Sequence, residues 1–360
     1  GFQAGYSVST GIYNTLIGGL AGDALTTGTK NVAIGYQALS TEDGHGRNVA
    51  IGYKALEMLN AGVDAYNIAI GADAGGSMST GTRNIVIGGQ AGDALTSGSH
   101  NVAIGDTALS AEDGHGRNVA IGHQALKVQN AGNDAYNIAI GYDAGAAVST
   151  GLYNTIVGGL AGDALTTGEK NTAIGKGALS TEDTGSRNTA VGYLALQALN
   201  YDGNGYNTAM GFAAGEVLTT GVNNTLVGAL AGDALTTGSH NEAIGLQALS
   251  TEDAHGFNVA IGKSALENLN AGADAYNVAI GFVGHEAGAL MTTGRYATLI
   301  GGLAGDALTT GTDNTAVGYG ALSSEDAHGG NTAVGMLALN TLDAGANAYN
   351  TAVGTDSGRY

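Results

Sequence analysis

The chain has 360 residues, of which 64 are glycine, and it contains no proline, cysteine or tryptophan. Its 12 Lys and Arg residues against 31 Asp and Glu give a net charge of −19, which excludes the basic face that nucleic-acid binding needs. The composition also excludes disulfides, thiolate metal sites and collagen, and no apolar run reaches the ~18 residues of a membrane-spanning helix.

One five-residue motif, Asn-x-x-(Ile/Val/Met)-Gly, recurs along the whole chain. Its spacings cycle through 17, 17, 19 and 17 residues, so twenty repeats form five superrepeats of 70 residues. One spacing is stretched to 20, near residues 281–290, and Ala297 replaces the Asn there. We interpret residues 1–360 as a single continuous array, without an internal domain boundary. The other nineteen repeats begin at Asn14, Asn31, Asn48, Asn67, Asn84, Asn101, Asn118, Asn137, Asn154, Asn171, Asn188, Asn207, Asn224, Asn241, Asn258, Asn277, Asn314, Asn331 and Asn350. We expect these Asn side chains to form a ladder that satisfies backbone groups of the turns, rather than to take part in catalysis.

Each motif predicts a short β-strand. We number positions from the motif Asn, which is position 0; Val, Ile or Thr dominates +1, Ala +2, and Ile or Val +3, with Gly at +4. Short apolar runs between Gly, Ser, Thr and Asp are typical of strands joined by turns, and no 3.6-residue period is present. A rung of ~17 residues loses roughly 25 kcal/mol of conformational entropy, which its few aliphatic side chains cannot offset alone. The sequence therefore predicts an all-β parallel β-roll, or solenoid, of about twenty stacked rungs of 17–19 residues, roughly 95 Å long.

Position +2 varies in a regular way. It is Ala in most repeats but large in the first repeat of every superrepeat, where +5 is Gly or Ala. This pattern indicates compensation of volume between +2 and +5 inside a packed space. Because strand alternation points +2 away from the +3 column, we expect one face to fill the roll and the Ala face, for example Ala33, Ala50 and Ala69, to be covered by other chains in a homotrimer. The alternative is that the Ala face meets the opposite wall of its own roll.

The segments "NVAIG", "NTAVG" and "NIAIG", with a short Tyr-x-Ala-Leu segment and a polar Gly-bearing turn after the motif, resemble YadA-like head repeats. Such repeats occur in trimeric autotransporter adhesins and in similar phage tail-fibre proteins. The resemblance covers essentially the whole chain. It implies a left-handed parallel β-roll, three chains side by side, and an extracellular place on a cell surface or a virion, in contact with host glycans or matrix. The rungs are longer than the usual adhesin rung.

Position −1 is the most biased column. It holds Tyr in eight repeats, Lys or Arg in six, and His or Phe in three, so rings and cations should stack at the rung spacing. We interpret the column as a stiffening ladder, or alternatively as a surface stripe that binds glycans or anions. The proposed stripe comprises Tyr13, Lys30, Arg47, Tyr66, Arg83, Arg117, Tyr136, Tyr153, Lys170, Arg187 and Tyr206.

Three further features of the sequence are candidate sites. The turn "TEDGHG" groups Glu42, Asp43 and His45, and its copies keep the pattern except for Gly185; we expect a solvated turn rather than a divalent metal site, because neighbouring turn residues rarely converge. The Asp of "AGDAL" is expected to cap a turn, with weak binding of Ca²⁺ as the alternative. His285 and Glu286 lie in the irregular insertion, and irregular loops on regular scaffolds often carry function. We favour drift in the repeat array as the explanation of these three extra residues.

No nucleophile–base pair stands apart from the repeat, so we expect neither catalysis nor a cofactor or metal. The favoured function is a structural and adhesive rod, a homotrimer with possible end-to-end assembly as part of a longer fibre. The alternatives are a polysaccharide-degrading β-helix enzyme and an ice-binding solenoid.

Overall fold

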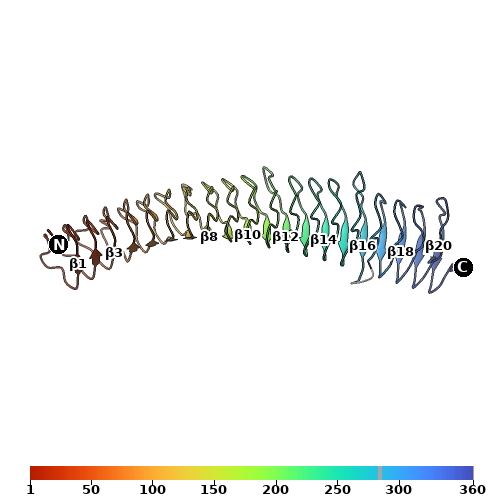
Figure 1. Cartoon of the computed structure of the whole chain (residues 1–360), viewed down its shortest axis with the longest axis horizontal. Helices are drawn as coiled ribbons and strands as arrows, with labels where there is room; N and C mark the ends of the chain where they lie inside the picture. Colours follow the sequence, from red (N-terminus) through yellow and green to blue (C-terminus); the bar gives the residue numbers. More distant parts are fainter. Residues whose placement is uncertain (283–285, 360) are drawn as a thin grey trace. The chain divides into compact units, whose positions relative to one another are not determined.

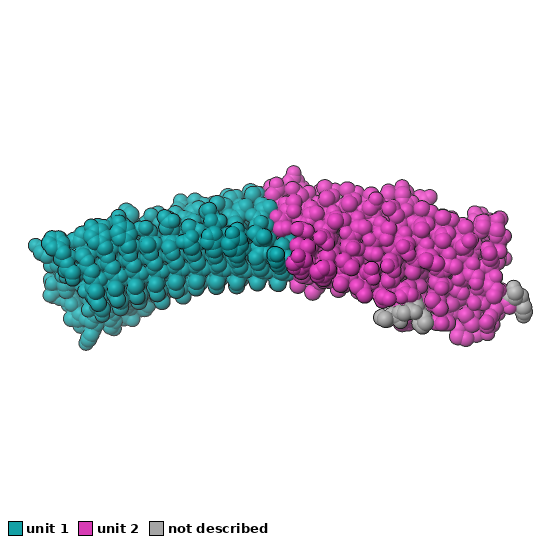
Figure 2. Space-filling view, viewed as in Figure 1, with its two compact units in different colours: residues 1–177 teal, residues 178–360 magenta. Residues whose placement is uncertain are grey.

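The computed structural model describes residues 1–282 and 286–359, and within them it is all-β, without a helix. It forms a parallel β-solenoid in which each motif supplies one three-residue strand (Figure 1). The chain divides into two compact units, residues 1–177 and 178–360 (Figure 2). In the described residues, no helix is long and apolar enough to cross a membrane.

Both units follow the same plan. Within each unit, every strand pairs in parallel with the next one along the chain, so Val102 of β6 faces Val119 of β7 and Ala103 faces Ala120. The first unit contains β1 (Thr15–Ile17), β2 (Val32–Ile34), β3 (Val49–Ile51), β4 (Ile68–Ile70), β5 (Ile85–Ile87), β6 (Val102–Ile104), β7 (Val119–Ile121), β8 (Ile138–Ile140), β9 (Thr155–Val157) and β10 (Thr172–Ile174). The second contains β11 (Thr189–Val191), β12 (Thr208–Met210), β13 (Thr225–Val227), β14 (Glu242–Ile244), β15 (Val259–Ile261), β16 (Val278–Ile280), β17 (Thr298–Ile300), β18 (Thr315–Val317), β19 (Thr332–Val334) and β20 (Thr351–Val353).

The +2 column lies inside the roll of its own chain. Ala33, Ala50 and Ala69 have no exposed surface even though a single chain is present. The expectation that other chains cover the Ala face is therefore wrong, and the alternative, in which this face meets its own roll, is correct. The +1 and +3 residues point outward instead and are half-buried or exposed, as at Ile138 and Ile140 of β8.

The expected compensation of volume is present, but the position whose side chain compensates for the size of +2 is +8 rather than +5. Where +2 is large, +8 is Gly: a Cβ built on Gly162 would lie 3.4 Å from Cδ1 of Ile156, and one on Gly145, in the previous rung, 2.9 Å from the same atom. Where +2 is Ala, +8 is usually a fully buried Leu, as in the pair of Ala103 and Leu109. The interior therefore accepts one large side chain at either position but not at both.

The corners of each rung use left-handed backbone. The residue at −1 has a positive φ in all twenty rungs, for example 65° at Arg117 and 51° at Tyr136, and only Gly330 among them is a glycine. Position +4 is more extreme, with φ of 135° at Gly105, where a Cβ would lie 2.3 Å from the carbonyl oxygen of Gly122 in the next rung. Glycine at +4 is thus required by both conformation and space.

Candidate binding surface and acidic loops

The motif Asn holds each rung to its neighbours. The Oδ1 of Asn101 accepts the backbone N–H of Asn118 at 3.0 Å, and its Nδ2 donates to the carbonyl of His115 at 3.2 Å. Asn101 and Asn118 are fully buried. The expected Asn ladder is confirmed, and its role is to satisfy the backbone at the corner that precedes each strand.

All eleven residues of the proposed stripe lie at this corner with positive φ; they are Tyr13, Lys30, Arg47, Tyr66, Arg83, Arg117, Tyr136, Tyr153, Lys170, Arg187 and Tyr206. Many of their neighbours along the column are stacked. In the first unit the rings of Tyr136 and Tyr153 stack at 5.8 Å. In the second unit His240, Phe257, Tyr276 and Tyr296 form a continuous stack with centroid distances of 4.9, 4.9 and 5.8 Å.

Cations extend the same ladder. The guanidinium of Arg47 lies 5.1 Å from the ring centroid of Tyr66, and that of Arg117 lies 5.4 Å from Tyr136. Each of these two arginines also pairs with a loop carboxylate, Asp64 at 2.8 Å and Asp134 at 2.9 Å. Because neighbouring rungs cover the ring faces, the ladder presents mainly ring edges, hydroxyl groups and cations to a ligand, and the structure favours stiffening as its first role.

A second aromatic column, at +5 on the opposite corner of the strand, was not predicted as a ladder. Tyr36 stacks on Tyr53 at 5.8 Å, and His123 stacks on Tyr142 at 5.2 Å. The signal was present in the sequence, since aromatic residues occupy +5 in consecutive repeats. The outward face of each strand therefore carries an apolar +3 side chain beside a +1 side chain that is Val, Ile or Thr, with Glu242 in β14 as the exception. This band lies between two corners that carry rings and charges.

The glutamate of each "TED" loop is fully buried, which contradicts the predicted solvated turn; these residues are Glu42, Glu112, Glu182, Glu252 and Glu325. Glu42 accepts the backbone N–H of His45 through Oε1 at 3.0 Å and that of Ala61, in the loop of the next rung, through Oε2 at 3.4 Å. A buried carboxylate thus joins the long loops of two neighbouring rungs. The recurrence of Glu in all five copies, where His is lost once, was the sequence signal.

The acids and His of these loops converge, although the sequence predicted that they would not. In four copies, Glu, Asp and His place one potential ligand atom each within 4.8 Å of one another, as in the group Glu252, Asp253 and His255. The Nδ1 of His255 lies 3.3 Å from Oε1 of Glu252. Both oxygens of Glu252 already accept backbone N–H groups, from His255 and from Ala271 at 3.2 Å each. The geometry accounts for the group as a brace between loops.

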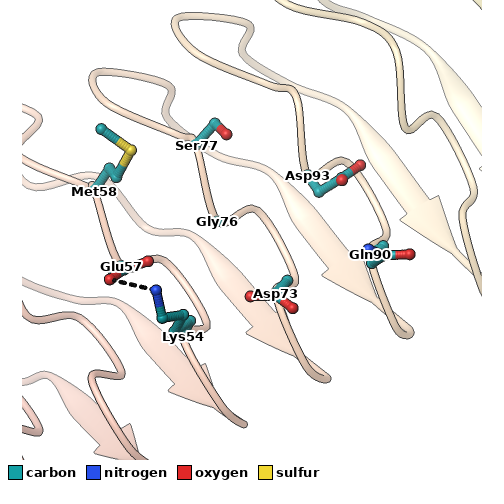
Figure 3. Close-up of a pocket in the computed structure, with 8 residues that line it drawn as sticks. All are labelled: Lys54, Glu57, Met58, Asp73, Gly76, Ser77, Gln90 and Asp93. Carbon is teal, nitrogen blue, oxygen red and sulfur yellow. Dashed lines mark ion pairs between the residues drawn. The ribbon is translucent and has the colours of Figure 1, made fainter.

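The Asp of "AGDAL" lies half-buried at the start of the loop, in a polar recess that Figure 3 shows around Asp93 together with Asp73, Gln90 and the ion pair of Lys54 and Glu57. Burial raises the pKa of Asp93, and the negative charge of the nearby Asp73 raises this pKa further. Hydrogen bonds from the backbone N–H groups of Asp93 and Ala94 act in the opposite direction and lower it. In all five superrepeats, one carboxylate oxygen of this Asp has no hydrogen-bond partner among the described residues; this atom is Oδ1 of Asp23, Asp93, Asp163, Asp233 and Asp306. The predicted turn cap is therefore incomplete.

The insertion contributes one contact at the surface. Oε1 of Glu286 forms an ion pair with Nζ of Lys263 at 3.5 Å. His285, the other residue predicted as a site in the insertion, lies outside the described residues. The structure thus gives Glu286 an ion pair within the chain.

Stability is expected to rise, not fall, as the pH is lowered from 7.5 toward the ordinary pKa values of the carboxyl groups. Burial raises the pKa of Asp93, Asp163, Asp233, Asp306, Glu112 and Glu182. A carboxyl with a raised pKa binds its proton more tightly in the folded state, so the folded state gains stability as the pH falls from the raised values toward the ordinary ones of 3.8 for Asp and 4.5 for Glu. Urea unfolding at pH 7.5, 6 and 5 measures this.

The paired variants Asp93→Asn and Asp43→Asn test whether half-buried carboxyl groups cause this pH dependence of stability. Asp93→Asn removes a half-buried charge and should raise stability at pH 7.5 while reducing the pH dependence. Asp43→Asn removes the same charge from an exposed side chain and should have a smaller effect. A wild-type chain that loses stability steadily from pH 7.5 to 5 would refute the prediction.

Comparison of the chain with family models, with curated proteins and with solved structures finds no match.

Proposed function

We propose that this chain is a non-catalytic, structural and adhesive segment of an extracellular fibre, on a cell surface or a virion, in which parallel copies associate along their outward strand faces. The observation that carries this proposal is the band of outward +1 and +3 side chains. It recurs at every rung, is rich in Val, Ile and Thr, and includes Ile85, Ile138, Ile140 and Ile174 at 36–38% exposure. An exposed, uninterrupted column of Ile, Val and Met at +3 within such a band is typical of an interaction surface.

Symmetry supports association with identical chains. A solenoid repeats the same surface at a fixed spacing, so a rotation axis parallel to the stack lets every rung make the same contact. The Ala column faces the interior of its own roll, so the outward band is the surface that meets the other copies. The number three and the left-handed coil come from the resemblance to YadA-like heads.

The chemistry of the polar residues also fits a structural role. The buried Asn and Glu columns bond to backbone of neighbouring rungs, and the corner rings stack on one another. Ring edges, tyrosine hydroxyls and corner cations remain accessible along the stripe. These groups suit weak, repeated contacts with surface glycans or matrix, which are the ligands that the resemblance implies.

Sedimentation equilibrium of the soluble chain should give three chain masses. Ile87→Glu and Ile104→Glu place charges in the outward band and should yield monomers that keep the β-sheet circular dichroism of the wild type. A wild-type chain that stays monomeric at micromolar concentration would contradict the assembly.

The adhesive and non-catalytic parts need a separate test. The wild-type chain should bind an array of surface glycans or matrix proteins and leave polysaccharides intact during long incubation. Cleavage of a polysaccharide that is abolished by one carboxylate substitution would instead support the enzyme alternative.

A further inference from the structure

The stacked corner ladder of the first unit is interrupted between Tyr66 and Arg83. The outer side of the ladder opens there into a recess of about 450 Å³, lined by Tyr66, Ile68, Arg83 and Ile85. Tyr66 is covered by the guanidinium of Arg47, and the described residues contain no ring or cation–π contact between Tyr66 and Arg83. The recess lies at the −1 edge of the outward band.

Arg83 differs from the neighbouring arginines in its partners. Arg47 and Arg117 pair with Asp64 and Asp134, whereas no carboxylate in the described part of the chain lies within ion-pair distance of Arg83. Its Nη1 donates to Nε2 of His100 at 3.4 Å. In a chain of charge −19, this cation at the edge of an apolar band is suited to a carboxylate from outside the chain.

A carboxylate lies at the same level on the opposite edge. Arg83 precedes β5 and Gly89 follows it, and a Cβ built on Gly89 would lie 2.9 Å from Oδ1 of Asp106. Asp106 therefore leans from its own rung over the corner of β5, into the space that Gly89 leaves. Its side chain is 64% exposed, and Nε2 of His123 lies 3.9 Å from its Oδ2.

A cyclic assembly would bring these two edges together. When identical chains turn the same face toward an axis parallel to the stack, the −1 edge of one copy meets the +5 edge of the next copy at the same height. Arg83 and Asp106 are at the same height because Asp106 leans over Gly89. The recess beside Arg83 offers room for the incoming side chain.

We propose that the recess at Tyr66 and Arg83 receives Asp106 of a neighbouring copy, and that the resulting ion pair fixes the register of the copies. This inference rests on the proposed assembly and adds its contact residues. The pair recurs once per interface, so three pairs act together in a closed trimer.

Charge reversal tests the pair. Arg83→Asp and Asp106→Arg each place like charges opposite each other, and each should weaken assembly by about tenfold or more, since even modest ion-pair energies add over three interfaces. The double variant Arg83→Asp/Asp106→Arg restores opposite charges and should return to within about threefold of the wild type. Sedimentation equilibrium measures association, and circular dichroism checks that each variant is folded.

Arg117→Asp is the matched control, because Arg117 occupies the same column but already pairs with Asp134 of its own chain. Adding Asp106→Arg to it should give no rescue. Suppose that the wild type forms trimers. The proposed ion pair is then refuted, while the assembly stands, if the single reversals leave association unchanged or if the double variant associates no more strongly than the single variants. A monomeric wild type refutes both.

Discussion

Glutamate in place of Ala103 is expected to unfold the rungs around β6, and not merely to dissociate an assembly. Ala103 has no exposed surface and lies beside Val86 in the register of β5 and β6. A carboxylate there would have neither water nor a cation, which costs at least ~3 kcal/mol. Hydrogen exchange should show loss of protection in β5, β6 and β7 first, because each rung is stabilised mainly by its neighbours.

Val102→Glu is the matched control, one residue away on the outward face. The chain already contains Glu242 at the same position of β14, where the strand still pairs with β13 and β15 in normal register. We therefore expect Val102→Glu to keep the fold. If Ala103→Glu remains as stable as Val102→Glu, the assignment of the +2 column to the interior is wrong.

Alanine in place of Gly105 is expected to have a similarly large effect for a different reason. The φ of 135° is nearly restricted to glycine, and the added Cβ would lie 2.3 Å from the backbone oxygen of Gly122, which cannot move without shifting the next rung. Strain and overlap together should cost at least ~3 kcal/mol. Urea unfolding followed by circular dichroism measures the loss.

Gly132→Ala provides the comparison. Gly132 also has a positive φ, 71°, but no atom lies within 4 Å of the position that its Cβ would take. Its substitution should cost only about 1 kcal/mol, the usual penalty for a left-handed conformation. Equal losses for the two variants would show that backbone conformation alone, and not the close approach of rungs, explains the glycine at +4.

Local repetition determined much of this protein from its sequence alone. The motif gave the number and position of the strands because ladder pairing in a solenoid needs the same residue at the same place in each rung. The Asn ladder followed from a polar side chain that recurs beside every strand. The stacking at −1 followed from Tyr and Arg at one position in successive repeats, and all three predictions are confirmed.

Only the tertiary structure decided which side of each strand faces inward. A strand such as Val102–Ile104 is apolar on both faces, so its alternation carries no signal of inside and outside. The narrow interior determines which face is buried. Leu109 at +8 already fills part of the interior, so position +2 has room for Ala but not for Ile. The burial of Glu42 is likewise a property of two loops packed together, since its second partner, Ala61, belongs to the next rung. No single repeat contains that contact, and so no reading of one repeat could have predicted it.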